Sequence, residues 1–401
     1  MLIVQKFGGS SVACPERIKN VAKRVAKNSE RDQVVVVVSA LGDTTDKLLE
    51  LAHQITDDPS RREVDMLIST GEQVSAALLS MALHQEGRKA ISLCASQVQI
   101  LTDSVHTKAR IQEIETKRIR QELAKDNIVI IAGFQGITED NDITTLGRGG
   151  SDLTAIALAS VLKASNCEIY TDVEGVFTAD PRVVPSAKKI EKLTFDEMLE
   201  MASLGAGVMQ TRAVELAKKH GVTFHVRSSL TETSGTIICE EVNNMEKLLV
   251  SGITMDPNEA KITVVGLSDQ PGIAGKVFSR LAEKEINVDM IIQSSAGEKR
   301  KNISFTVAKD DLRKALSGIE TLRSQIEIGS VVSDENMAKV SVVGVGMMSQ
   351  PGVAAKMFSA LADKGINIDM ISTSEIKISC VIERAKMKEA AEALHSAFGL
   401  D

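Results

Sequence analysis

Residues 270–291 read QPGIAGKVFSRLAEKEINVDMI, and residues 350–371 read QPGVAAKMFSALADKGINIDMI. Fifteen of these 22 paired positions are identical at an offset of 80, so the C-terminal third of the chain holds two copies of one module. In each copy a β-branched run, Ile262–Val265 or Val340–Val343, leads through a Pro-Gly loop into a helix with apolar residues at helical spacing. An Ile-Asn-Val/Ile-Asp strand follows, and this order is typical of a ferredoxin-like βαββαβ unit.

The two copies differ at their ends. In the first copy, residues 303–332 supply two more strands around a second helix, whereas the second copy stops after its second helix and lacks a fourth strand. A strand-like segment over residues 247–253 precedes the first copy without an obvious partner. We therefore expect the first module, about 261–333, to be inserted into the second, which would comprise 245–256 plus 339–401.

The preceding part of the chain, residues 1–244, has a different pattern. Strand-like runs such as Val34–Val38 and Ile128–Ala132 alternate with helical segments such as Val64–His84 and Ala109–Leu123. Alternation of this kind predicts an α/β domain in which helices cover both faces of a largely parallel sheet.

The amino-acid composition argues against nucleic acid and membranes as partners. With 401 residues, 43% hydrophobic and 25% charged, the chain is long enough for two or three folded domains. Lys+Arg 47 against Asp+Glu 54 gives a net charge of -7, and there are only nine Phe, one Tyr and no Trp. Nucleic acid is therefore not expected as a partner. Five widely spaced cysteines without Cys-x-x-Cys, no signal-peptide pattern and only strand-sized apolar runs predict a cytoplasmic protein without a membrane partner.

Two glycine-rich segments follow strands and open helices. KFGGSS begins at Lys6, where bare backbone can approach a phosphate and the lysine can reach a transferred phosphoryl group. Alternatively, it is a glycine-rich turn with a surface lysine, and it is not a Walker A motif. TTLGRGGSD, residues 144–152, combines Arg148, suited to bidentate recognition of a carboxylate, with Asp152, which could hold Lys6 or help to arrange a metal. The alternative is a simple helix cap formed by Ser151-Asp152.

Two further segments carry polar groups. TDVEGVFTADPR, residues 171–182, directly follows a strand and suits the edge of a nucleotide site, although it could be a plain hairpin loop. STGE, residues 69–72, places a glycine inside a helical pattern, where glycine is unfavourable relative to alanine. That glycine indicates either a close approach of backbone or ligand, or a helix–helix contact.

Taken together, these segments resemble the aspartate kinases in content and order. The resemblance also includes VSALGDTTD (residues 38–46) and GFQG (residues 133–136), and the duplicated tail looks like the paired ACT modules of those enzymes. It implies a three-layer α/β amino-acid-kinase fold followed by two ACT modules. It further implies ATP-dependent phosphorylation of the β-carboxylate of L-aspartate, the first step of lysine, threonine and methionine biosynthesis, with feedback through the ACT modules.

The resemblance also implies roles for individual residues. The implied catalytic residues are Lys6, Arg148 and Asp152. The residues that would contact ATP are Lys6, Phe7, Gly8, Gly9, Ser39, Thr171, Asp172, Phe177, Asp180 and Arg182. Those that match the aspartate site are Thr45, Glu72, Arg148, Gly149, Gly150 and Ser151, with Arg148 on the α-carboxylate and Glu72 on the α-ammonium group. Related sequences often have an aromatic hydroxyl where Phe177 stands, and the segment Cys94–Gln99 departs from the family pattern and receives no role.

The repeats could be architectural dimerisation modules, but their loops also suit a small zwitterion. Ser268–Gly272 leaves a carboxylate and free amides beside a helix start. The ACT resemblance implies an effector, lysine and/or threonine, at Asp269, Ala274, Asn287, Gln293, Ser349 and Asn367. Ser349 stands where the first copy has Asp269, so the two pockets are not equivalent. We expect a homodimer or larger assembly through the ACT modules, with or without a short chain initiated near Met245 or Met255.

The residue types by themselves also suit phosphorylation of a carboxylate, independently of the family resemblance. A β-carboxylate has an ordinary pKa near ~4 and is ionised at pH 7, so it needs no general base. Phosphoryl transfer requires positioning and charge neutralisation, which lysine, arginine, glycine amides and an oxygen-ligated Mg²⁺ provide. Two alternatives remain open: a kinase for another carboxylate such as glutamate, and a catalytically silent amino-acid sensor.

Overall fold

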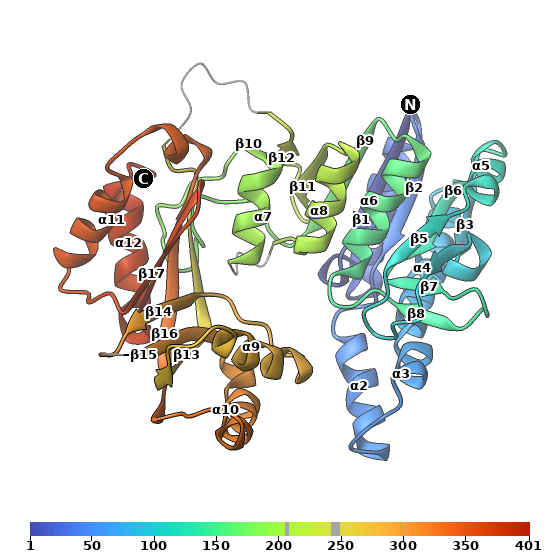
Figure 1. The fold of residues 1–401 in the computed structure, drawn as a ribbon. Coiled ribbons are helices and arrows are strands. Elements are labelled where there is room, and N and C mark those ends of the chain that lie inside the picture. Colours follow the sequence, from blue (N-terminus) through green and yellow to red (C-terminus); the bar gives the residue numbers. More distant parts are fainter. Residues whose placement is uncertain (205–207, 242–248, 298) are drawn as a thin grey trace. The chain divides into compact units, whose positions relative to one another are not determined.

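The computed structural model describes residues 1–204, 208–241, 249–297 and 299–401. These residues form two compact units, each described here by itself (Figure 1). The first unit consists of Met1–Val176, Lys189–Ser203 and 208–241. The second consists of Phe177–Lys188 and 249–401, so a short segment from the middle of the chain belongs with the C-terminal repeats.

An eight-stranded sheet forms the centre of the first unit. In spatial order its strands are β10 (Lys192–Thr194), β12 (Thr236–Cys239), β11 (Phe224–Ser228), β9 (Asn166–Thr171), β1 (Leu2–Phe7), β2 (Gln33–Val38), β6 (Ile128–Ala132) and β3 (Ala90–Leu93). All neighbours are parallel except β11 and β12. The five consecutive valines of β2 are all buried, because helices cover both faces of the sheet.

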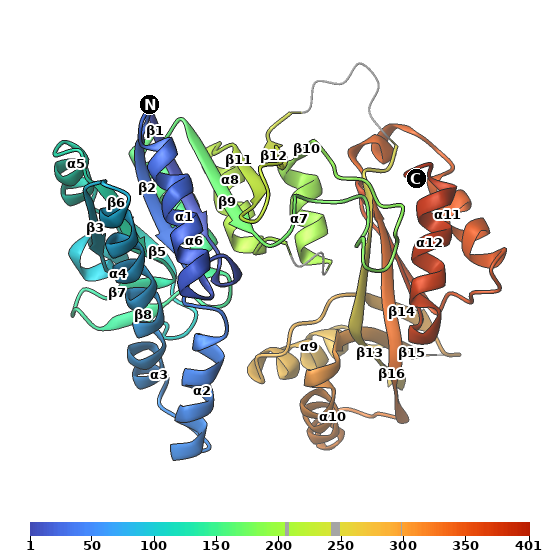
Figure 2. The ribbon, with the colours of Figure 1, turned by 180° about the vertical axis from the view of Figure 1, so that it is seen from behind.

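Helices α1 (Pro15–Asn28) and α4 (Thr70–Gln85) pack on one face of this sheet, and α6 (Gly150–Leu162) packs on the other beside α8 (Thr211–His220). Figure 1 shows α6 and α8 in front of the strands, and Figure 2 shows the opposite face with α1. The remaining helices are α2 (Thr44–Ile55), α3 (Arg61–Ile68), α5 (Lys117–Leu123) and α7 (Phe195–Ser203), with 3-10 turns η1 (Gly9–Val12) and η2 (Ala95–Gln97).

The stretch Arg61–Gln85 is long and apolar enough to cross a membrane by length and composition alone. Half of its most apolar window is buried inside the protein, and Ala76, Leu79 and Leu83 pack into the core beneath the sheet. Core packing therefore accounts for its apolar character. The sequence predicted one helix here, but the structure has two, α3 and α4, separated at Ser69. The carbonyl of Ser69 accepts a hydrogen bond from Gln135 Nε2 at 2.5 Å, which ties the break to a neighbouring strand.

A second, four-stranded sheet lies in the same unit. Its order is β5 (Ile111–Ile114), β4 (Ile100–Thr102), β7 (Gln135–Ile137) and β8 (Ile143–Thr145). The predicted helix over Ala109–Leu123 is therefore wrong in its first half. Residues of β5 pair antiparallel with β4, with Ile114 opposite Ile100, and only Lys117–Leu123 is helical. Both isoleucines are buried, so tertiary pairing decides the conformation of this segment.

The second unit is built on a six-stranded antiparallel sheet. Its order is β14 (Ile291–Ser295), β15 (Arg300–Ala308), β13 (Gly252–Ser268), β16 (Ser330–Val343), β18 (Lys377–Glu383) and β17 (Met370–Thr373). Its helices are α9 (Ile273–Glu283), α10 (Leu312–Glu320), α11 (Val353–Ala362) and α12 (Met387–Ala397), with 3-10 turns η3 (Lys309–Asp311), η4 (Thr321–Ser324), η5 (Val345–Ser349) and η6 (Arg384–Lys386). The long strands β13 and β16 each run through both repeats. Gly252–Asp256 pairs with Lys339–Val343, and Ile262–Val265 pairs with Ser330–Ser333.

Reciprocal ion pairs join the two repeats. Lys261 of the first repeat pairs with Asp369 of the second at 2.6 Å, and Lys339 of the second pairs with Asp289 of the first. Lys339 is buried and also contacts Glu259 at 2.5 Å. Burial works against the charge of Lys339, but these carboxylates hold its pKa above its ordinary value. Burial raises the pKa of Glu259, because that carboxylate lies in the same enclosed cluster.

The segment Phe177–Lys188 packs into the second repeat. Ile253 N donates to Thr178 O at 2.7 Å, which extends the pairing of β13. The Thr178 hydroxyl lies 2.8 Å from Nε2 of His395, a fully buried side chain of α12. Ala179 and Val184 are buried in the apolar core of the same repeat. This segment is therefore held by apolar burial and by hydrogen bonds of Thr178 near one end and of the Ser186 hydroxyl to Asp401, at 2.7 Å, near the other.

Candidate active site

Lys6 and Asp152 form a buried ion pair at the centre of the first unit. Lys6 is the penultimate residue of β1, and Asp152 lies in the first turn of α6. The Nζ of Lys6 lies 2.5 Å from Oδ1 of Asp152, and the side chains are only 11% and 9% exposed. The carboxyl end of a central strand beside a helix N-terminus is a favourable position for anionic phosphates.

Gly9 is required by close packing, whereas a Cβ atom at Gly8 would make only ordinary contacts. A Cβ atom on Gly9 would lie 2.9 Å from the carbonyl oxygen of Ala40, and one on Gly8 would lie 3.4 Å from Nζ of Lys6. Ser39 N donates to Phe7 O at 3.1 Å, which brings the end of β2 alongside the same loop. The glycine loop therefore packs closely against the turn after β2 and lies directly beside the lysine.

A groove with a volume of about 320 Å³ adjoins this loop. Ser11, from the turn after the glycines, lines one side of it, and the chain around Ser229 lines another. Its basic side chains come from α1 and are Arg17, Lys23, Arg24 and Lys27. Glu232 also lines the groove and pairs with Arg24 at 3.0 Å, and the remaining cations favour an anionic ligand at this edge of the glycine loop.

Glu72 is a buried carboxylate with one oxygen left for a ligand. It lies in the first turn of α4 and is 3% exposed. Ala40 N donates to its Oε1 at 3.1 Å, whereas the buried Oε2 has no hydrogen-bond partner among the described residues. Burial raises the pKa of Glu72 to about 7. A Cβ atom on Gly71 would lie 2.8 Å from Cβ of Ala40, so this glycine serves a close approach between α4 and the turn after β2.

The Gly147–Ser151 loop presents an exposed arginine. Gly147 and Gly149 have φ values of +81° and +70°, which side-chain-bearing residues rarely adopt. Arg148 lies between them, is exposed, and makes no side-chain hydrogen bond within the described parts of the chain. A Cβ atom on Gly133 would lie 2.8 Å from Oγ of Ser151, so this glycine allows α6 to approach the sheet closely. The arginine is therefore displayed by a turn that needs glycine on both sides of it.

The predicted nucleotide residues are divided between the two units. Thr171 and Asp172 follow β9 in the first unit, where the Thr171 hydroxyl donates to Oδ1 of Asp172 at 3.0 Å. Phe177, Asp180 and Arg182 belong to the segment in the second unit. Arg182 donates through Nε and Nη2 to Asp180, at 3.0 and 2.8 Å, and this pairing lowers the pKa of Asp180. Thr45, predicted to contact aspartate, is the second residue of α2 and is half-buried.

A polar network beneath the strand ends was not predicted from the sequence. The ring of Phe7 stacks on Tyr170 with centroids 4.7 Å apart. Glu168 accepts hydrogen bonds from Gln5 Nε2 at 2.7 Å, from the Tyr170 hydroxyl at 3.0 Å and from Arg227 at 2.7 Å. Burial opposes the charge on Glu168, but these donors hold its pKa below its ordinary value. The sequence signal that could have revealed this network is the presence of polar residues, such as Gln5 and Glu168, inside otherwise buried strands.

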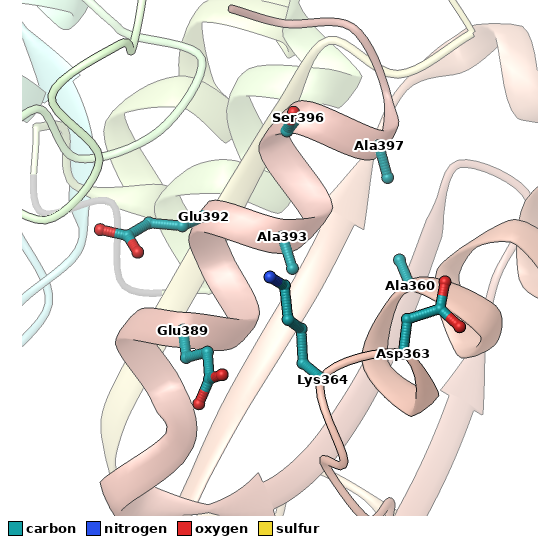
Figure 3. A pocket seen from close by; sticks show the side chains of 8 residues that line it. All are labelled: Ala360, Asp363, Lys364, Glu389, Glu392, Ala393, Ser396 and Ala397. Carbon is teal, nitrogen blue, oxygen red and sulfur yellow. The ribbon is translucent and has the colours of Figure 1, made fainter.

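The predicted effector residues lie mostly at exposed positions. Asp269 is about half exposed and lies 3.4 Å from the ammonium group of Lys301. Asn287, Gln293 and Asn367 are exposed, Ala274 is half-buried, and the side chain of Ser349 falls outside those described. A separate groove of about 390 Å³ lies between α11 and α12, where Figure 3 shows Lys364 among acidic side chains. None of the six predicted effector residues lines that groove.

Comparison with known proteins identifies the chain. Residues 1–228 match the amino acid kinase family, and residues 262–322 and 340–398 match the ACT domain. The aspartokinase of Bacillus sp. strain MGA3 is 52% identical over 400 residues, covering 100% of this chain and 97% of that protein. The chain belongs to the aspartate kinase family. The predicted fold class, enzyme class and repeated ACT region of this aspartate kinase are thereby confirmed.

Other aspartate kinases match over the full length. The aspartate kinase of Pseudomonas putida KT2440 is 52% identical over 402 residues, covering 100% of this chain and 98% of the relative. E. coli aspartokinase III, solved with aspartate and ADP in an R-state, has a TM-score of 0.83 and 26% identity, with 99% of each chain covered. The T-state structure of that relative, with lysine and aspartate, has a TM-score of 0.78. The predicted aspartate kinase function is thus confirmed.

Proposed function

We propose that this aspartate kinase uses ATP as phosphoryl donor and L-aspartate as acceptor, and that Lys6, Asp152, Arg148 and Glu72 carry the reaction. The buried ion pair between Lys6 and Asp152, at the end of the central strand, is the observation that carries this assignment. ADP and aspartate bound to the E. coli relative support the same two ligands here. The basic groove beside the glycine loop supports an anionic cosubstrate.

In the proposed reaction an oxygen of the ionised β-carboxylate attacks the γ-phosphorus of ATP, and the bond to the leaving ADP oxygen breaks. No proton has to be removed from the acceptor, so a general base is unnecessary. The Lys6 ammonium stabilises the charge that develops on the phosphoryl and leaving oxygens, while Asp152 holds Lys6 in place. The phosphates are proposed to lie beside Lys6 against the loop at Gly8 and Gly9.

Aspartate is proposed to be held by its α-substituents. Two N–H groups of Arg148 would bind the α-carboxylate in the bidentate manner that guanidinium groups favour. The unpartnered Oε2 of Glu72 would accept a hydrogen bond from the α-ammonium group. Fixing both α-groups leaves the β-carboxylate as the free nucleophile, and it sets the reach of the side chain so that aspartate is favoured over glutamate. Thr45, Gly149, Gly150 and Ser151 would complete the site.

Magnesium is proposed to accompany ATP. The described residues contain no group of three or more His, Cys, Asp or Glu side chains that could hold a metal by themselves. This fits an ion bound mainly by phosphate oxygens with one or two carboxylates, and Asp152 is a carboxylate placed beside the phosphate-binding lysine. When bound, the ion would neutralise phosphate charge.

Regulation and assembly are proposed from the repeats. We infer that lysine and/or threonine binds at the residues predicted for the effector, and lysine in the E. coli relative supports this class of ligand. The proposal also includes a homodimer or larger assembly through the ACT repeats, with or without a short regulatory chain. It places the protein in the cytoplasm, without nucleic-acid or membrane partners.

The experiment is formation of aspartyl hydroxamate from ATP, Mg²⁺ and hydroxylamine, with aspartate or glutamate as acceptor. Arg148→Ala should raise the KM for aspartate at least ~100-fold, because a bidentate charged contact is lost, and should leave the KM for ATP within about twofold. Arg148→Lys is the matched control and should recover only part of the affinity. Equal activity with glutamate, or an unchanged KM for aspartate in Arg148→Ala, would disprove the assigned roles. Repeating the assay with lysine, threonine and both tests the effector.

A further inference from the structure

Asp65 is a buried carboxylate that the proposed chemistry does not use. It lies in α3 and is fully buried. Its Oδ1 accepts a hydrogen bond from the Thr145 hydroxyl at 2.5 Å, and its Oδ2 lies 2.8 Å from Nδ1 of His106. Thr107 N donates to the two oxygens at 3.1 and 3.0 Å. One carboxylate therefore joins two segments that are far from it in the sequence.

Both of these segments adjoin the Gly147–Ser151 loop: one directly precedes it in the sequence, and the other lies next to it in space. Thr145 ends β8, three residues before Arg148. Thr107 has φ of +69°, an unfavourable conformation for a β-branched residue, and its amide hydrogen bond to Asp65 helps to maintain it. A Cβ atom on Gly147 would lie only 3.2 Å from the carbonyl oxygen of Thr107, so the loop passes close to the Thr107 turn at a position where it has no side chain.

Arg212 of α8 supports the same arrangement from the opposite side. Its Nη1 donates to Leu146 O at 2.7 Å, and its Nη2 donates to Ala109 O at 2.9 Å. Ala109 N donates to Thr145 O at 2.9 Å, which closes the contact between the two segments. Both sides of the loop base are thus fixed by charged side chains that bind the chain directly before Arg148.

We propose that Asp65 is a positioning residue for aspartate binding. It holds Thr145 and the Thr107 turn so that the loop presents Arg148 to the α-carboxylate of the substrate. This inference rests on the proposed role of Arg148. A carboxylate suits the position because its oxygens accept hydrogen bonds, and the hydroxyl of Thr145 and the amide of Thr107 both donate to it. Asparagine would turn an NH₂ group toward one of these donors.

The test compares Asp65→Asn with two changes at its partner. Asp65→Asn should raise the KM for aspartate about tenfold, with kcat lowered less and the KM for ATP within about twofold. Thr145→Val, which lacks the hydroxyl, should act in the same direction, and Thr145→Ser, which keeps it, should stay near the unchanged enzyme. The double variant Asp65→Asn/Thr145→Val should be no worse than Asp65→Asn alone, because both changes remove one interaction.

Three results are decisive. If Arg148→Ala leaves the KM for aspartate unchanged, the proposed role of Arg148 fails independently of Asp65. If Arg148→Ala weakens aspartate but Thr145→Val and a folded Asp65→Asn do not, the positioning role of Asp65 fails alone. If the KM values for aspartate and ATP rise together with a large loss of thermal stability, Asp65 is only a structural residue. Should Asp65→Asn not fold, the contrast between Thr145→Val and Thr145→Ser gives the decision.

Discussion

Glu72→Gln separates the roles of burial and charge in the proposed aspartate site. Burial raises the pKa of Glu72 from 4.5 to about 7 in the ligand-free protein, whereas the unfolded chain keeps the ordinary value. Below pH 4.5 the carboxyl group is protonated in both states and carries no penalty. As the pH rises toward 7, the unfolded chain releases its proton first, so the folded protein loses stability. Above pH 7 the loss is complete and amounts to about 3 kcal/mol.

The same pKa also governs binding of the α-ammonium group. Here a rise in pH is favourable, because ionisation of Glu72 strengthens the binding. At pH 6 roughly a tenth of Glu72 is ionised, and at pH 8 roughly nine-tenths is. If only the ionised form binds the ammonium group, the apparent KM for aspartate should fall about tenfold over this range. Glutamine keeps an oxygen for Ala40 N but has no charge. Glu72→Gln should therefore be more stable at pH 8 by about 3 kcal/mol and yet bind aspartate more weakly.

The assay consists of two pH series on the unchanged enzyme and on Glu72→Gln. Thermal unfolding without ligands should show a gain in the variant at pH 8 that disappears at pH 4.5. Steady-state kinetics from pH 6 to pH 8 should show a KM for aspartate that falls in the unchanged enzyme and stays flat in the variant. A variant that is destabilised at pH 8, or one that retains the pH dependence of KM, would refute the assignment of Glu72 as the buried ammonium partner.

Three further changes have definite expected outcomes. Lys6→Met should lower kcat about 10³-fold in the hydroxamate assay, because it removes a preorganised charge; near-full activity would contradict that role. Gly133→Ala should raise the KM for aspartate severalfold without affecting that for ATP, since a Cβ atom there would lie 2.8 Å from Ser151 Oγ. Lys339→Met should destabilise the protein by about 3–5 kcal/mol in thermal unfolding, because it leaves buried carboxylates uncompensated. Its control, Lys261→Met at the more exposed pair, should cost less than about 1 kcal/mol.

The central sheet was predictable because its strands are apolar on both faces. The valines of β2 and the run Ile128–Ala132 are unbroken apolar segments, and the glycine motifs mark where strands end. The short strands of the second sheet were not predictable from periodicity. A three- or four-residue segment such as Ile111–Ile114 gives too little pattern to separate strand from helix, and pairing with Ile100–Thr102 decides it.

The same contrast holds for the candidate site. Lys6, Glu72, Arg148 and Asp152 stand in motifs whose composition indicates phosphate or carboxylate chemistry. Asp65 had no such signal, because one carboxylate in the helical stretch RREVDMLI looks like an ordinary surface charge. Only the fold shows that it faces inward and accepts hydrogen bonds from residues 41 to 80 positions away. Residues that act by holding a loop are recognised from contacts, which a single sequence does not contain.

The segment Phe177–Lys188 suggests how the ACT repeats could influence the proposed ATP site. The family resemblance implies that Phe177 belongs with Thr171 in the nucleotide site, yet its neighbours Ala179 and Val184 are buried in the core of the second repeat. The chain runs without interruption from β9 into this segment, so a rearrangement of the second repeat has a direct covalent path to residues beside the proposed ATP site. Allosteric coupling of ~1–3 kcal/mol is sufficient for useful inhibition. Loss of one or two hydrogen bonds such as that between Thr178 and His395, at about 1 kcal/mol each, has that magnitude.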